Sequence, residues 1–141
     1  MKGIVLLSHG PLAKGMYETT KWFMGDDIAQ YEYLCLEPTE QPEAFDLRIK
    51  EKLNDVDSGE GVILITDLKS GTPCNRCIRF ADAKITVLCG MNLSLVLELL
   101  GRRLSNDYNF KELIAISQEG ICNINDILAE VEDDETGLAL D

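Results

Sequence analysis

The stretch that decides the fold lies near the start of the chain: Ile4-Val5-Leu6-Leu7-Ser8-His9-Gly10. Its first four residues are apolar without polar alternation, which is typical of a strand covered on both faces in a parallel sheet. The runs 62–65 and 85–88 have the same character, and longer segments of helical periodicity separate the three. The sequence therefore predicts an α/β fold, a single domain with a mostly parallel central sheet flanked by helices.

The apolar pattern also predicts where the elements begin and end. Strands are expected over residues 3–7, 31–36, 61–66 and 84–89. Helices are expected over 11–24, 40–53, 73–81, 93–102 and 110–119, whereas 124–131 is periodic enough to be helix or strand. In the first helix, the side chains expected to face the core are Leu12, Met16, Thr19, Thr20 and Phe23.

Length and charge limit the possible functions. With 141 residues, 45% hydrophobic and 27% charged, the chain is expected to form one globular domain. Its net charge of −12 argues against nucleic acid or an anionic membrane as a partner. No apolar run approaches the roughly 20 residues of a membrane span, and the start is too short for a signal peptide. We therefore expect a cytoplasmic protein with no direct membrane insertion, ending in an acidic tail over 129–141.

The cysteines leave one alternative open. Five cysteines are an odd number, and their dispersal favours reduced thiols. Cys74 and Cys77 form a C-x-x-C pair at the start of a predicted helix, so the alternative is a thiol redox protein that uses these two cysteines. No metal site is expected, because the chain has a single histidine and its other cysteines are scattered. No cofactor is expected either.

The single histidine, His9, follows the first apolar strand. Imidazole has a pKa near neutrality and can act as a nucleophile, a base or a phosphoryl acceptor. Asp67 ends the third strand, and the carboxyl ends of parallel strands meet at the edge where sites form. A carboxylate bound to one ring nitrogen would fix the tautomer and leave the other nitrogen nucleophilic. The alternatives are a histidine that only satisfies a hydrogen bond and an aspartate that only caps a helix or turn.

A glycine-containing turn follows Asp67 and reads Ser70-Gly71-Thr72-Pro73. Glycine lets the backbone approach an anion, Thr72 adds a hydroxyl, and proline suits the first turn of a helix. Together these features are compatible with phosphate binding. The pattern is not a Walker loop, because the glycine-lysine signature is absent. Ordinary turn-to-helix junctions share the same composition.

Three motifs together resemble a known family. The first is Ser8-His9-Gly10 followed by Ala13, Gly15 and Met16; the second is Asp67 with Gly71-Thr72-Pro73 and Asn75; the third is Gly90-Met91-Asn92-Leu93. In this order, over roughly residues 1–128, they resemble the IIA component of the mannose/sorbose-family sugar phosphotransferase system (PTS). The resemblance implies a domain over 1–128, and a homodimer that exchanges a C-terminal strand.

The resemblance also implies a phosphoryl relay. His9 would accept a phosphoryl group from the phosphocarrier HPr and pass it to a IIB component that serves a sugar permease, while Asp67 would orient the ring. Ser70, Gly71 and Thr72 would bind the phosphoryl oxygens. Lys69 and Asn92 are candidates for the partner surface.

Three residues depart from the family pattern. Ser70 stands where a second glycine is usual, which would be strained if that position requires a positive φ. Lys69 places a cation beside the expected phosphate, and Ser94 replaces a common proline. Dihydroxyacetone-kinase phosphodonor subunits and phosphorylation-dependent regulatory domains share the fold, and the histidine alone does not separate them from a PTS carrier.

Overall fold

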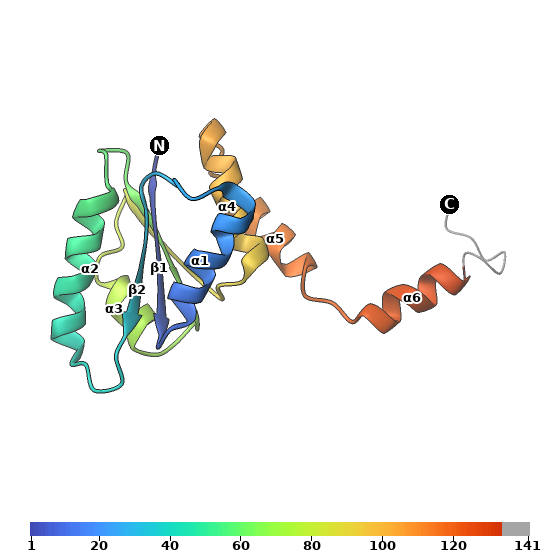
Figure 1. Ribbon diagram of the computed structural model, residues 1–141, viewed down its shortest axis with the longest axis horizontal. Helices are drawn as coiled ribbons and strands as arrows, with labels where there is room; N and C mark the ends of the chain where they lie inside the picture. The colour runs from blue at the N-terminus through green and yellow to red at the C-terminus, as the bar shows by residue number, and fades with distance from the viewer. Residues whose placement is uncertain (134–141) are drawn as a thin grey trace.

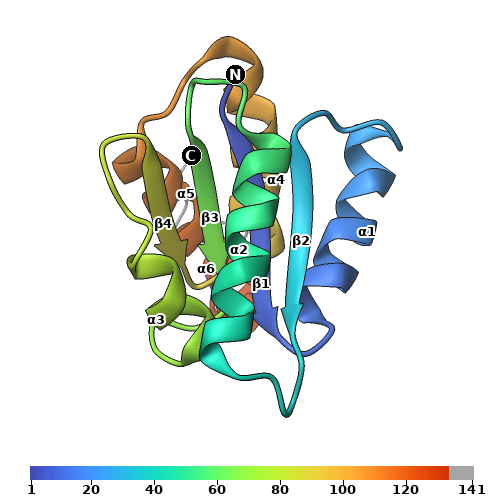
Figure 2. The same cartoon turned by 90° about the vertical axis from the view of Figure 1, so that its left-hand side faces the viewer.

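The computed structural model describes residues 1–133, which form a four-stranded sheet between two layers of helices (Figures 1 and 2). The strands are β1 (Gly3–His9), β2 (Tyr31–Leu36), β3 (Val62–Thr66) and β4 (Ile85–Cys89). All pairings are parallel and the order is β2-β1-β3-β4. The prediction of an α/β domain with a parallel sheet is confirmed. The strand order reverses beside β1, so a crevice is expected beyond the carboxyl ends of β1 and β3.

Helices cover both faces of the sheet. They are α1 (Leu12–Met24), α2 (Pro42–Val56), α3 (Thr72–Ile78), α4 (Leu93–Arg102), the 3₁₀ helix η1 (Arg103–Ser105), α5 (Phe110–Glu119) and α6 (Ile124–Asp133). Successive strand side chains point to opposite faces. Ile4 and Leu6 therefore pack with α1, α4 and α5, whereas Val5 and Leu7 pack with α2 and α3. Both faces of β1 are buried, as its unbroken apolar run predicts.

The predicted inner face of α1 is confirmed in part. Thr20 is buried as expected and Met16 packs partly buried against the core, but Leu12 and Phe23 are 50% and 60% exposed and Ala13 is buried instead. The small Ala13 allows the helix to approach the sheet closely, and the Thr20 hydroxyl lies 2.8 Å from that of Tyr31. This contact, with Tyr17 stacked on Tyr31 at 4.8 Å between ring centroids, orients α1 so that Leu12 and Phe23 face outward.

The chain after α5 leaves the body of the domain. In Figure 1, α6 extends away from the sheet, and none of its residues is buried. Residues 124–131 are thus helical, so within the described part of the chain the C-terminal segment forms no strand; the exchanged strand and the homodimer stay predictions. The helix crosses the expected boundary at residue 128, and the end of the expected acidic tail, 134–141, lies outside the described residues. No helix within residues 1–133 has the length and apolarity that crossing a membrane requires.

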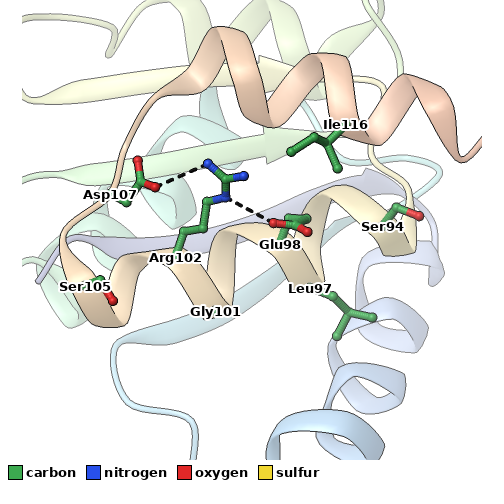
Figure 3. Close-up of a pocket in the computed structure, with 8 residues that line it drawn as sticks. All are labelled: Ser94, Leu97, Glu98, Gly101, Arg102, Ser105, Asp107 and Ile116. Atoms are coloured by element: carbon green, nitrogen blue, oxygen red, sulfur yellow. Dashed lines mark hydrogen bonds and ion pairs between the residues drawn. The ribbon is translucent and has the colours of Figure 1, made fainter.

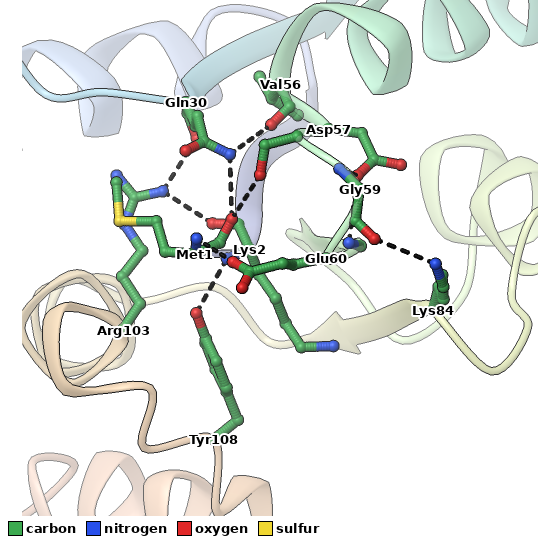
Figure 4. A network of polar contacts seen from close by, with 12 residues as sticks. Met1, Lys2, Gln30, Val56, Asp57, Gly59, Glu60, Lys84, Arg103 and Tyr108 are labelled. Carbon is green, nitrogen blue, oxygen red and sulfur yellow. Dashed lines mark hydrogen bonds and ion pairs between the residues drawn. The ribbon is translucent and has the colours of Figure 1, made fainter.

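A buried arginine joins the residues that precede β1 to those that precede β2 (Figure 4). Arg103 is only 2% exposed, and its guanidinium donates to the carbonyls of Lys2 and Gln30, each at 3.0 Å, and to that of Ala29. Burial lowers the pKa of Arg103. Gln30, in turn, donates to the carbonyls of Met1 and Val56. This network lies at the edge of the sheet opposite to the end of β1.

Candidate functional site

The histidine and the aspartate expected to form a pair do meet. His9 is the last residue of β1, and Asp67 follows the last residue of the adjacent strand β3. Asp67 Oδ2 lies 2.9 Å from His9 Nδ1 and accepts a second hydrogen bond from the His9 backbone N–H at 3.0 Å. Asp67 Oδ1 accepts from the Leu68 N–H at 2.9 Å. One carboxylate therefore holds both the ring and the backbone of His9.

This geometry fixes the tautomer of the imidazole. Partial burial acts to raise the pKa of Asp67, but hydrogen bonds from His9 and Leu68 outweigh it and hold the pKa below its ordinary value. At neutral pH Asp67 is therefore an ionised carboxylate that can only accept. Nδ1 of His9 must then carry the proton, which leaves the Nε2 lone pair of the neutral ring free to act as a nucleophile.

Gly71 lies against this free nitrogen. A Cβ atom at position 71 would stand 2.8 Å from His9 Cε1 and 2.9 Å from Nε2, closer than real Cβ contacts allow. The residue also has φ +104°, a conformation that favours glycine. The His9 side chain is still 43% exposed, so its ring remains accessible from solvent. The structure thus brings three of the expected site residues together: His9, Asp67 and Gly71.

The other expected site residues lie in the turn after Asp67 and at the starts of α3 and α4. Thr72 begins α3, and Ser70 and Lys69 are exposed in the preceding turn. Among the described residues only Gln30 and Asn106 combine a side chain with positive φ, so Ser70 is not strained in the way its departure from the family pattern could have implied. Asn92 caps α4, with its side chain accepting from the Leu95 N–H at 2.8 Å. Its carbonyl oxygen is therefore already engaged in the fold.

The sequence interpretation gave no separate function to Ser8. Its Oγ accepts a hydrogen bond from the Ala13 N–H at 2.7 Å and donates to the Gly10 carbonyl at 2.9 Å. The contact satisfies a backbone donor in the first turn of α1, where Pro11 at the N-cap makes no side-chain hydrogen bond. The sequence does indicate this role for Ser8, because a serine between an apolar strand and a helix start is a common capping residue.

The cysteine pair gives no support to a redox site. Cys74 is 5% exposed and Cys77 is fully buried in α3. Burial, with a smaller contribution from Cys74, raises the pKa of the Cys77 thiol far above its ordinary value. Since the thiolate is the reactive form, these side chains act as small apolar groups in the core. Within the described residues, no group of three or more histidine, cysteine or acidic side chains could hold a metal ion.

A hollow elsewhere on the surface lacks a comparable chemical centre. It has a volume of about 590 Å³ and lies between α4 and α5 (Figure 3). Arg102 crosses it and pairs with Glu98 at 3.1 Å, Asp107 at 3.2 Å and Glu112 at 2.9 Å. The cation is matched by acidic neighbours, so the hollow offers no unpaired charge from this residue to a ligand. The His9 edge remains the candidate site.

Known proteins are similar to this chain in sequence and in fold. The mannose-specific EIIAB component of the PTS from Escherichia coli (strain K12) is 27% identical over 118 residues, which cover 82% of this chain and 36% of that protein. A PTS IIA protein associated with the fucose utilization operon of Streptococcus pneumoniae superposes with a TM-score of 0.82 at 27% identity, covering 90% of this chain and 96% of that one. The PTS component EIIA of Streptococcus agalactiae gives a TM-score of 0.77 at 22% identity, covering 89% and 98%.

The sequence profile of one family spans most of the chain. The EIIA-man family, described as the PTS system fructose IIA component, matches residues 3–118. This range contains β1, β3 and the turn to α3, and with them His9, Asp67 and Gly71. The chain belongs to the EIIA-man family of PTS IIA components.

Proposed function

We propose that this chain is a cytoplasmic phosphocarrier of the sugar PTS, which accepts a phosphoryl group from phospho-HPr on His9 and passes it to a IIB component. The observation that carries the proposal is the 2.9 Å contact between Asp67 Oδ2 and His9 Nδ1, which leaves Nε2 as the free nucleophile. Family membership supports the class of reaction. The net charge of −12 is compatible with a basic docking face on HPr.

The transfer needs few groups. The Nε2 lone pair attacks the phosphorus of the donor phosphohistidine, a bond from phosphorus to Nε2 forms, and the donor nitrogen leaves with its bonding electron pair. The imidazole becomes cationic, and the Asp67 carboxylate stabilises that charge through Nδ1–H. We propose that Gly71, Thr72 and Ser70 bind the phosphoryl oxygens, with Lys69 close to the incoming partner. Positioning and electrostatics then account for most of the catalysis.

The assembly and the acceptor complete the proposal. We propose that the chain works as a homodimer; four α6 side chains that expose apolar surface, Ile124, Ile127, Leu128 and Val131, are compatible with a further contact. The same chemistry on His9 would also serve a regulatory domain or a dihydroxyacetone-kinase phosphodonor. The dihydroxyacetone-kinase phosphodonor differs from a sugar carrier in the protein that accepts the phosphoryl group. In the regulatory domain, phosphorylated His9 changes a partner instead of feeding transport.

Intact-mass analysis tests the proposal directly. The protein is incubated with phosphoenolpyruvate, enzyme I and HPr, and in parallel with HPr omitted. One acid-labile phosphoryl group, dependent on HPr, is the expected result. Release of that group on addition of a IIB component, but not of a dihydroxyacetone kinase, would favour the sugar carrier. A protein that gains no mass under these conditions is not an HPr-dependent carrier.

Asp67→Asn should slow phosphoryl acceptance by about 100-fold without unfolding the protein, because the amide removes the charge that fixes and stabilises the ring. Quenched-flow measurement of acceptance from phospho-HPr gives the rate. Asp46→Asn is the matched control, since Asp46 also has a lowered pKa but pairs with Arg76. An unchanged rate in Asp67→Asn would show that the His9–Asp67 contact has no part in transfer.

The same variant has an expected pH signature. Because the folded-state pKa of Asp67 is lowered, its contribution to the free energy of unfolding is complete above the ordinary pKa of an aspartate, about 3.9. The contribution is lost as the pH falls through the lower folded-state value. The stability difference between wild type and Asp67→Asn should therefore be largest near neutrality and shrink in acid.

Gly71→Ala should slow acceptance by about 100-fold, because the added methyl group would displace the imidazole from its position. Gly59→Ala is the control that separates the effect of this contact from the effect of backbone strain. Gly59 has φ +109°, close to that of Gly71, but a Cβ there meets nothing within 4 Å. Both variants should lose similar stability in urea unfolding, and only Gly71→Ala should lose rate. Equal rates would mean that the ring can move away from residue 71 at no cost.

A further inference from the structure

We infer that Ser8 is a positioning residue for phosphoryl transfer, an inference that rests on the proposed function of His9. Ser8 is fully buried although its side chain is polar, and it directly precedes the histidine. Its hydroxyl acts twice, as acceptor from the Ala13 N–H and as donor to the Gly10 carbonyl. A buried hydroxyl whose donor and acceptor are both used is held firmly in place.

These two bonds close the turn that carries His9. The chain leaves β1 at His9, passes Gly10 with φ +58°, and enters α1 at Leu12. The Gly10 N–H donates to the Leu36 carbonyl of β2 at 3.0 Å. Ser8 thus links the end of β1 to Gly10 and to the first turn of α1, while Leu36 of β2 binds the Gly10 N–H. His9 itself pairs with Leu36 of β2, and its N–H donates to Asp67.

Movement of this turn would reach the imidazole. Asp67 Oδ2 bonds both the His9 backbone N–H and Nδ1, so a shift of the backbone also changes the ring contact. On the other side of the ring, Gly71 leaves no room for even one added carbon. A ring held between two such contacts tolerates little displacement. Loss of the Ser8 hydroxyl should therefore slow transfer as well as lower stability.

The test compares two serines with similar bonds. Ser117 in α5 is 5% exposed and its Oγ donates to the Leu113 carbonyl at 2.8 Å; it lines a small hollow with Asn92 but forms no hydrogen bond with His9, Asp67 or Gly71. Ser8→Ala should slow acceptance from phospho-HPr by about tenfold, whereas Ser117→Ala should stay within about twofold of wild type. Because His9 is the single histidine of the chain, ¹⁵N NMR reports its ring without overlap. The Nδ1–H signal should exchange faster with water in Ser8→Ala only.

Two further variants keep the inference falsifiable. Ser8→Thr retains the hydroxyl and should recover most of the rate. Ser8→Cys retains the volume with a poorer hydrogen-bonding group, and replaces Ser8→Ala if that protein does not fold. A folded Ser8 variant with the rate of Ser117→Ala and an unchanged Nδ1–H signal would overturn the inference. If wild type accepts no phosphoryl group, the proposed function fails, but the NMR comparison still decides whether Ser8 positions the ring.

Discussion

His9→Ala is expected to abolish phosphoryl acceptance, leaving no mass increase after incubation with phosphoenolpyruvate, enzyme I and HPr. The reason is chemical: Nε2 of His9 is the nucleophile that the Asp67 contact leaves free. The described structure offers no second imidazole, since the chain has one histidine. The thiols of the C-x-x-C pair are poor substitutes, because Cys74 and Cys77 are buried and the pKa of Cys77 is raised. The loss should therefore be complete within detection, unlike the partial losses at positions 67 and 71.

The variant should remain folded. The His9 side chain is 43% exposed, and Asp67 keeps backbone donors from residues 9 and 68. Urea unfolding should thus show a modest change in the free energy of unfolding, on the order of 1 kcal/mol for one lost hydrogen bond. Asp46→Asn, whose side chain pairs with Arg76 and has no part in the proposed transfer, is the control and should still accept the phosphoryl group. A phosphoryl group retained on His9→Ala would assign acceptance to another residue.

Arg103→Met should lower the free energy of unfolding by on the order of 3 kcal/mol, a large part of the 5–15 kcal/mol typical of a domain. The change removes the donors to three carbonyls while retaining a long apolar side chain. The carbonyl of Gln30 keeps the Ile4 N–H as a donor, so the loss falls mainly on the carbonyls of Lys2 and Ala29. Urea unfolding and calorimetry measure the effect.

Two controls separate this effect from the loss of a positive charge. Arg79→Met makes the same change in net charge at a side chain that is 63% exposed, where a surface ion pair contributes little. Arg103→Lys keeps the charge but loses the planar fork that reaches several carbonyls, so it should recover only part of the stability. Equal stability of Arg103→Met and Arg79→Met would show that the buried network adds nothing.

The fold was largely predictable because its signal is local. An apolar run without alternation identifies a doubly covered strand whatever its neighbours are, and β1, β3 and β4 each contain one. The exposure of Leu12 and Phe23 in α1 was not predictable in this way, although Met16 and Thr20 face the core as expected. It depends on a hydroxyl contact between Thr20 and Tyr31, eleven residues apart, which competes with the hydrophobicity of Leu12 and Phe23.

The site was predictable in part for a similar reason. Parallel strands bring their carboxyl ends to one edge, so His9 and Asp67 could be placed together from their positions after two apolar runs. The contact between Gly71 and Nε2 depends on the path of the turn, and sequence pattern does not encode that distance. Arg103 was not predictable either, since an arginine beside a helix end is usually solvated, and the carbonyls that bind it come from residues more than seventy positions away.

Because all four strands are parallel, selection for stability and selection for partner recognition act on opposite edges of the sheet. Every strand begins at the edge where Arg103 lies and ends at the edge that carries the histidine. Substitutions at opposite edges share no side-chain partner, so their free energies should add. Evolution can then alter the partner-facing turns of such a domain without compensating changes at the far edge, and stability gained at the far edge can offset the cost of new specificity.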